Sequence, residues 1–263
     1  MKLQIFQVDA FASRLFSGNP AAVVPLDSWL DDKLLQSIAI ENNLSETAYI
    51  IATLGAETDF HIRWFTPGAE VSLCGHATLA TAHTLWNHLG FTKDRIVFDS
   101  LSGPLNVSRD GDLIQLDFPL VPMSSCEPSK ELVKALGAKP IECHSGRDVL
   151  CLFENESDVL SLKPDFAALA AIPDGRAVMV TALGSKSDFV SRFFAPRVGV
   201  NEDPVTGSAH CALTPYWAEK LCKTRMKALQ LSPRGGELEC ELAGDRVLLR
   251  GRAVTFMTGT IEI

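Results

Sequence analysis

Four polar residues of this sequence have the side-chain types that proton transfer requires: Glu46, His76, Asp203 and Ser208. The chain contains two similar copies of one unit, and each of these polar residues is present in only one copy. Gly175 lies 129 residues beyond Glu46, and Ser208 stands where the other copy has His76. Carboxylate, imidazole and hydroxyl groups can hold, move or donate protons to a bound molecule. Because scaffold positions should look alike in both copies, we interpret these four as candidate site residues.

The repeat itself is clearest between Arg63 to Trp86 and Arg192 to Trp217. Both stretches run Arg-x-Phe-x-Pro, then a loop, then a glycine that opens an apolar helix. Ala52 to Phe60 also matches Thr181 to Phe189 at a constant offset of 129, and other matching pairs keep offsets between 128 and 133. A period this long indicates two similar domains rather than a solenoid.

We therefore predict an α+β fold of two tandem, pseudo-symmetric domains, each a mostly antiparallel curved sheet wrapped around a buried central helix. The expected ranges are 1–118, a proline-containing linker at 119–128, and 129–263. The helix starting at Gly75 is apolar around its circumference, as is typical of a helix inside a protein. Further helices are expected at 30–42, capped from Asp27-Ser28, at 129–136, at 164–171 and from Gly207, and a polar turn is expected around Leu54-Gly55.

Gly75 and Gly207 each open one of the buried helices. The first N–H groups of a helix have no partner within it, and the helix dipole favours negative charge there. Two such ends facing a cleft between the domains could hold a carboxylate substrate. The alternative is plain capping, with Ser208 and Thr206 bonding their own helix.

Each candidate also has a simpler interpretation. Glu46 could be a surface carboxylate at the end of a strand, His76 a capping histidine, and Asp203 part of a turn with Pro204. Cys74 precedes a helix N-terminus, which can stabilise a thiolate, yet a buried inert cysteine is commoner.

Composition restricts the class of protein. A formal net charge of −8 without a lysine and arginine cluster argues against nucleic-acid binding. No apolar run is long enough to span a membrane, and no signal peptide is evident, so we expect a cytoplasmic protein. The seven cysteines are odd in number and never form Cys-x-x-Cys, which argues for reduced thiols.

Four segments together resemble the phenazine-biosynthesis (PhzF-like) isomerase family of the diaminopimelate epimerase superfamily, and the similarity covers nearly the whole chain. They are GNPAAVV, SETAYI, RWFTPGAEVSLCGHATLATAH and RFFAPRVGVNEDPVTGSAH. The resemblance implies a diaminopimelate epimerase-like fold with its active site between the domains, and neither cofactor nor metal. We also expect a small carboxylate-bearing substrate and a homodimer.

Carried over by residue, the resemblance places the acid/base glutamate on Glu46, the active-site histidine on His76, and the family's aspartate and serine on Asp203 and Ser208. Ser45, Gly75 and Gly207 fall on neighbouring substrate-binding positions. Superfamily racemases use two opposed cysteines. Here Cys74 holds the first position, but Thr206 stands at the second, which disfavours a two-thiol racemase.

The sequence thus predicts a cofactor-independent isomerase that moves a proton, and with it a double bond, next to a carboxylate. Two alternatives stay open at this point. One is an epimerase or racemase that uses Cys74 as a single base or with a second, different base. The other is a small-molecule binding protein without turnover.

Overall fold

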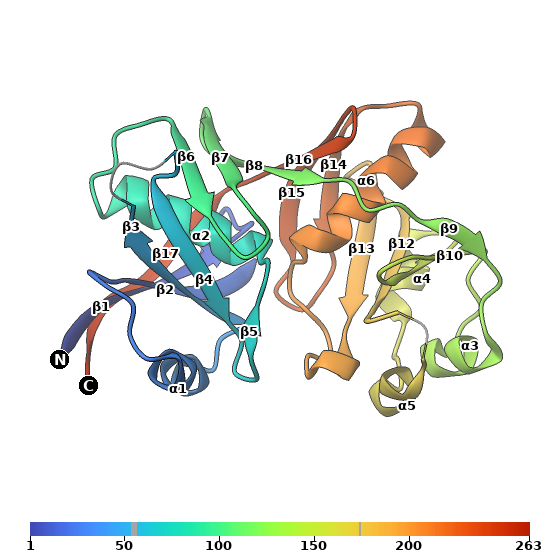
Figure 1. Cartoon of the computed structure of the whole chain (residues 1–263). Helices are drawn as coiled ribbons and strands as arrows, with labels where there is room; N and C mark the ends of the chain where they lie inside the picture. The colour runs from blue at the N-terminus through green and yellow to red at the C-terminus, as the bar shows by residue number, and fades with distance from the viewer. Residues whose placement is uncertain (54–56, 174) are drawn as a thin grey trace. The chain divides into compact units, whose positions relative to one another are not determined.

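The computed structural model describes residues 1–53, 57–173 and 175–263, so the turn expected at Leu54-Gly55 lies outside the described residues. The chain forms two compact units (Figure 1). The first comprises Met1–Phe118 and Leu248–Ile263, and the second comprises Pro119–Val247. No helix within the described ranges is long and apolar enough to cross a membrane.

This division differs from the expected ranges at both ends of the second domain. The last strand, β17 (Ala253–Glu262), pairs antiparallel along β1 (Lys2–Ala10) and therefore belongs to the first unit. Within the expected linker, β9 (Ser124–Cys126) pairs with β10 (Glu142–Ser145) and belongs to the sheet of the second unit.

The first unit is a sheet built around one central helix, α2 (Gly75–Asn87), which contacts β1, β2, β3 and β17. A second helix, α1 (Asp32–Asn42), packs on β3 and β4. The remaining strands are β2 (Asn19–Pro25), β3 (Glu46–Ala52), β4 (Phe60–Phe65), β5 (Glu70–Val71), β6 (Arg95–Asp99), β7 (Leu105–Asp110) and β8 (Leu113–Pro119).

The second unit has the same plan around α6 (Gly207–Leu221), which contacts β14 and β15. Its other helices are α3 (Lys130–Leu136), α4 (Glu156–Ser161), α5 (Phe166–Ala171) and the short 3₁₀ turn Pro196–Val198. Its other strands are β11 (Val149–Leu152), β12 (Val178–Leu183), β13 (Phe189–Phe194), β14 (Arg225–Gln230) and β15 (Gly236–Ala243). The strand β16 (Arg246–Gly251) begins in the second unit, which ends at Val247, and continues into the last segment of the first unit.

The pairing directions of the strands repeat between the units. From β1 through β2, β3, β4 and β6 to β7, successive pairs are antiparallel, parallel, antiparallel, parallel and antiparallel. From β10 through β11, β12, β13 and β14 to β15, the same five directions follow in the same order. Gly75 and Gly207 are the first residues of the two central helices, as the repeat predicts.

The central helix of the first unit is buried on almost every side, so its polar side chains must find partners within the fold. The hydroxyls of Thr78, Thr81 and Thr84 donate to backbone carbonyls one turn earlier, the last two at 2.7 and 2.9 Å. A buried hydroxyl without a partner would cost about 1–3 kcal/mol. These bonds let a helix that contains three threonines sit inside the sheet.

One predicted helix cap needs correction. The cap of α1 is Asp31, whose carboxylate accepts the backbone N–H of Lys33 at 2.9 Å, and not the Asp27-Ser28 pair. The sequence pattern also gave no indication of α4, because six residues are too few for an apolar period to be recognised.

A close backbone approach at Gly18 leads to a test of the fold. Gly18 has a φ of +68°, and a Cβ there would lie 2.2 Å from the carbonyl oxygen of Ala10. We expect Gly18→Ala to lower the free energy of unfolding by about 3 kcal/mol, through both the left-handed backbone and the steric overlap. Gly111 is the matched control, because its φ is +62° and nothing lies within 4 Å of its added Cβ.

Gly111→Ala should cost only about 1 kcal/mol, from backbone strain alone. Urea unfolding of both variants measures the difference. Equal losses for the two variants would show that the contact between Gly18 and Ala10 does not constrain the fold.

Candidate active site

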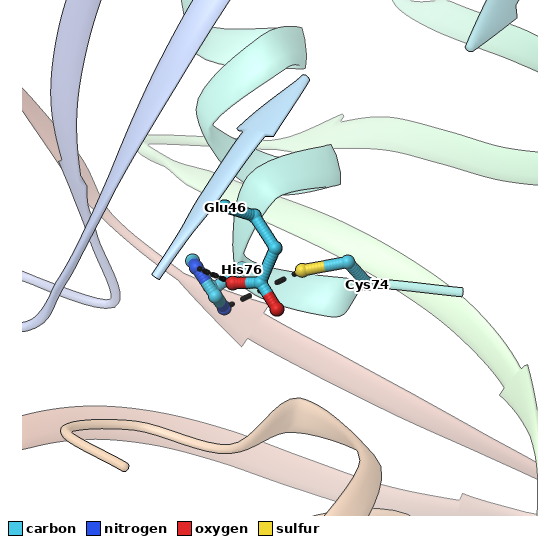
Figure 2. Close-up of side chains that lie close together, drawn as sticks. All are labelled: Glu46, Cys74 and His76. Atoms are coloured by element: carbon cyan, nitrogen blue, oxygen red, sulfur yellow. Dashed lines mark hydrogen bonds and ion pairs between the residues drawn. The ribbon is translucent and has the colours of Figure 1, made fainter. Parts of the chain in front are cut away.

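Three predicted residues meet in the first unit: Glu46, Cys74 and His76 (Figure 2). Oε2 of Glu46 lies 3.0 Å from Nε2 of His76, and Sγ of Cys74 lies 3.6 Å from Nδ1 of the same ring. The imidazole thus has the carboxylate on one nitrogen and the thiol on the other. Cys74 and His76 are buried, whereas the Glu46 side chain keeps 17% of its surface exposed. Glu46 is therefore the most exposed side chain of the three.

Two elements bring these side chains together. Glu46 is the first residue of β3, Cys74 is the N-cap residue of α2, and His76 is the second residue of that helix. Cys74 makes no capping hydrogen bond with its side chain. The buried His76 ring lies against Glu46 and Cys74, so of the simpler interpretations a packed histidine fits better than a capping one.

Asn19, which the sequence analysis did not select, completes the group. Its Nδ2 lies 3.3 Å from Nδ1 of His76, and its Oδ1 accepts the Ser45 hydroxyl at 2.9 Å. In this orientation Nδ1 accepts a hydrogen bond, and the ring proton of a neutral imidazole sits on Nε2, facing Glu46. The Asn19 amide therefore connects the Ser45 hydroxyl to the His76 ring.

Burial and neighbouring charges act in opposite directions on this group. Burial lowers the pKa of His76, but the charges of Cys74 and Glu46 and the hydrogen bonds to them outweigh burial and raise it well above its ordinary value. Burial, aided by the Glu46 charge, raises the pKa of the Cys74 thiol to about 11. An uncharged thiol adds no negative charge beside the ring, so the Glu46 carboxylate is the main cause of the raised His76 pKa. Cys74 is thus a neutral thiol at pH 7 rather than a nucleophilic thiolate.

The same three residues offer one donor atom each within 4.8 Å of one another, close enough to hold a small cation. Mixed sulfur, nitrogen and oxygen donors are the set that Zn²⁺ prefers. However, Oε2 of Glu46 and Nε2 of His76 already face each other at ion-pair distance, so an ion would have to separate them. The arrangement matches acid/base chemistry without rearrangement.

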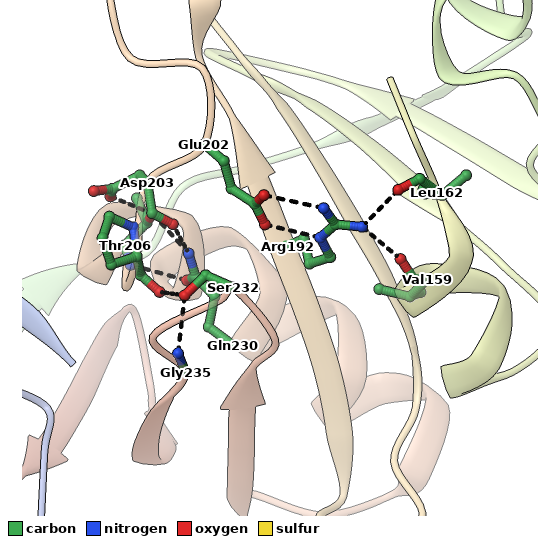
Figure 3. A network of polar contacts seen from close by, with 10 residues as sticks. Val159, Leu162, Arg192, Glu202, Asp203, Thr206, Gln230, Ser232 and Gly235 are labelled. Atoms are coloured by element: carbon green, nitrogen blue, oxygen red, sulfur yellow. Dashed lines mark hydrogen bonds and ion pairs between the residues drawn. The ribbon is translucent and has the colours of Figure 1, made fainter. Parts of the chain in front are cut away.

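Gly75 is the first residue of α2, whereas Asp203, Gly207 and Ser208 lie in the second unit, before or at the start of α6. Figure 3 shows Asp203 with its partners Thr206 and Gln230. The Thr206 hydroxyl donates to the Asp203 carboxylate at 2.5 Å, and the backbone N–H of Thr206 donates to Oε1 of buried Gln230 at 2.9 Å. The same Gln230 amide donates to the carbonyl oxygen of Asp203 at 2.7 Å. Asp203 is therefore held in an ordered network and is more than a turn residue.

Gly207 and Ser208 are the first two residues of α6, and neither caps the helix. Thr206, the N-cap residue, makes no side-chain capping bond. Within the described part of the chain, the half-buried Ser208 hydroxyl has no recorded hydrogen bond, so the capping alternative for these residues is not supported. That Gly207 and Ser208 share one cleft with Glu46 stays a prediction.

The repeated arginines anchor the loops that lead into both central helices. Nε and Nη2 of Arg63 bond both oxygens of Glu70 at 2.7 and 2.8 Å, and Arg192 binds Glu202 in the same way at 2.8 and 3.0 Å (Figure 3). Each guanidinium also lies over the ring of the phenylalanine two residues later, at 5.1 and 4.9 Å. Such two-point pairs fix both distance and orientation. The glutamates precede Gly75 and Gly207 by five residues.

Comparison with known proteins identifies the family. A family described as "Phenazine biosynthesis-like protein" matches residues 8–259. An uncharacterized isomerase of Pseudomonas aeruginosa is 51% identical over 263 residues, covering the whole of both chains. The crystal structure of a PhzF family protein from Enterococcus faecalis superposes with a TM-score of 0.96 at 45% identity, again over the whole of both chains.

The fold and the named relatives define an isomerase. The chain belongs to the phenazine biosynthesis-like (PhzF) family. The crystal structure of a hydroxyproline epimerase from Agrobacterium vitis superposes with a TM-score of 0.63 at 13% identity. The superposition covers 99% of this chain and 92% of the epimerase chain. At that identity the likeness concerns the fold alone, and it places the chain among the epimerase-like folds.

The network around Asn19 can be tested by stability. Asn19→Ala removes the amide that bonds both Ser45 and His76, which leaves a buried ring nitrogen without its partner. We expect the free energy of unfolding to fall by about 2 kcal/mol. Asn106→Ala is the control, because Asn106 bonds an exposed guanidinium and should cost less than about 0.5 kcal/mol. Urea unfolding that ranks the two variants alike would contradict a buried, ordered network at Asn19.

Proposed function

We propose that the protein is a cofactor-independent isomerase that moves a proton, and so a double bond, next to the carboxylate of a small metabolite. The observation that carries the proposal is the position of Glu46. Its side chain is partly exposed, and Oε2 of its carboxylate lies 3.0 Å from Nε2 of the buried His76 ring. A base must reach the carbon-bound proton and also have a defined orientation.

In this mechanism Glu46 removes the proton from one carbon of the substrate and returns it to another. His76 orients the carboxylate, and its protonated ring, which the raised pKa favours, can give up a proton and regain it between the two steps. The uncapped N–H groups at Gly75 and Gly207 are proposed to bind the substrate carboxylate and the negative charge that develops in the transition state. Asp203 and Ser208 are proposed to orient the substrate.

An epimerase that uses Cys74 is the second candidate, supported by the contact between its Sγ and the His76 ring. Two facts rank it lower. Burial keeps Cys74 a neutral thiol, with its pKa raised to about 11, and Thr206 occupies the position of the opposing cysteine. A binding protein without turnover ranks third, because it gives no role to a partly exposed carboxylate held by a buried imidazole.

The reaction class can be tested in deuterated water. The protein is incubated with a panel of small unsaturated carboxylic acids and amino acids, and mass spectrometry and NMR locate carbon-bound deuterium. Deuterium at a new carbon together with a shifted double bond supports the isomerase. Inversion at a stereocentre without a shifted double bond supports the epimerase, and absence of exchange across the panel leaves the binding protein as the better account.

Glu46→Gln keeps the shape of the side chain and one hydrogen-bonding oxygen but removes the titratable group. We expect kcat to fall by about 10²–10⁴, with substrate binding largely retained. Turnover, ligand affinity and thermal stability are measured together, with Glu41→Gln, an exposed carboxylate of the same unit, as the matched control. A variant that keeps its kcat would remove Glu46 from the role of base.

Cys74→Ala tests the second candidate directly. Because the thiol is neutral and has no opposing cysteine, we expect the variant to keep most of its turnover. A moderate loss of stability is expected from the small cavity. Initial rates and unfolding midpoints separate the two effects. A loss of kcat as large as that of Glu46→Gln would place the epimerase first.

A further inference from the structure

Three cysteines lie side by side on neighbouring strands of the second unit, far in sequence from the residues discussed so far. Cys126 of β9 is directly opposite Cys143 of β10, and Cys143 is directly opposite Cys151 of β11. Opposite residues of antiparallel strands share one face of the sheet. Sγ of Cys126 lies 3.5 Å from Sγ of Cys143, so these two thiols are in contact. None of the three cysteines is in a disulfide.

The three thiols differ in their access to solvent. Cys143 and Cys151 belong to the core of the unit, at 3% and 0% exposure, whereas Cys126 is half-buried and packs against that core. The hydrogen bond with Cys143, followed by burial and the neighbouring thiols, raises the pKa of Cys151 well above its ordinary value. Cys126 is therefore the thiol that a small oxidant can reach, with Cys143 directly behind it.

We propose that Cys126 and Cys143 form an oxidative modification site, in which a peroxide converts the two thiols into a disulfide between β9 and β10. Opposite residues of antiparallel strands have Cα atoms about 4.5–5.5 Å apart. Disulfides accept Cα separations of about 4.4–6.8 Å. The backbone therefore needs no rearrangement, and side-chain rotation brings the two sulfurs to bonding distance.

The chemistry balances with hydrogen peroxide as the only co-reactant. The Cys126 sulfur attacks one peroxide oxygen and breaks the O–O bond, which gives a sulfenic acid and one water molecule. The Cys143 sulfur then attacks the Cys126 sulfur and displaces its oxygen as a second water molecule, which forms the S–S bond. The two thiols lose two hydrogens and two electrons, and the peroxide is reduced to water.

The bond would close a loop that contains α3, whose residues Leu132, Ala135 and Leu136 pack in the same core as the thiols. Joining the two ends of such a segment restricts the unfolded chain and stabilises the folded one. Oxidation should therefore raise the midpoint of thermal unfolding by several degrees, and a reductant should reverse the shift. The inference is independent of the proposed reaction, since it concerns none of the proposed site residues.

Peptide mapping tests the site. The full chain is treated with hydrogen peroxide, denatured, alkylated and digested with trypsin. Lys130 and Lys134 lie between Cys126 and Cys143, and Arg147 separates both from Cys151, so the three thiols fall in three peptides. We expect one cross-linked pair that joins the Cys126 and Cys143 peptides, is lighter by two hydrogens, and disappears with dithiothreitol.

Variants make the test specific. Cys126→Ser should abolish both the cross-link and the reversible thermal shift, whereas Cys222→Ser, which changes an exposed cysteine, should keep both. The proposal is overturned if both thiols remain alkylatable after peroxide treatment. It is equally overturned if Cys126 accumulates as sulfinic acid without a cross-link, or if the disulfide joins Cys143 to Cys151.

Discussion

Burial of one helix in each unit sets the conditions for the rest of the structure. Ten residues of α2, from His76 to Trp86, are buried, so sheet must surround the helix and its polar groups must be satisfied internally. Three threonines meet that demand with bonds to the preceding turn. His76 lies on the same buried helix, where Nδ1 of its ring contacts the Asn19 amide and Nε2 lies at ion-pair distance from Glu46. The candidate catalytic group is thus a consequence of placing a histidine at the start of a buried helix.

The loops before the two central helices are anchored by the same arginine–glutamate pair in both copies, whereas the residues nearest the helices differ. In each loop, the arginine of the preceding strand donates two hydrogen bonds to a glutamate of the loop. Between that glutamate and the helix, the first copy ends in Cys74 and the second carries Asp203 and Thr206. Anchoring the loop at a distance left these positions able to change without loss of the helix geometry.

The sequence was sufficient to predict the duplication and both central helices, because the two copies could be compared with each other. It also selected Glu46, Cys74 and His76, which lie together in the structure. Contacts between residues far apart in the sequence could not be predicted in this way. Asn19 follows a turn glycine and precedes a proline, which is the pattern of an ordinary turn, and only the folded chain brings its amide to His76. The last strand was assigned to the wrong copy for a related reason: pairing between β17 and β1 joins residues some 250 positions apart, and local patterns carry no information about it.

That pairing has a consequence for how the protein is made. During synthesis the first unit lacks one of its strands until the ribosome has completed the second unit and added the final segment. At about 5–20 residues per second, β1 waits many seconds for β17. Until then one edge of β1 is unpaired, and an open edge can pair with another chain. The nascent protein therefore passes through a period in which a neighbouring chain can occupy the position that its own last strand takes later.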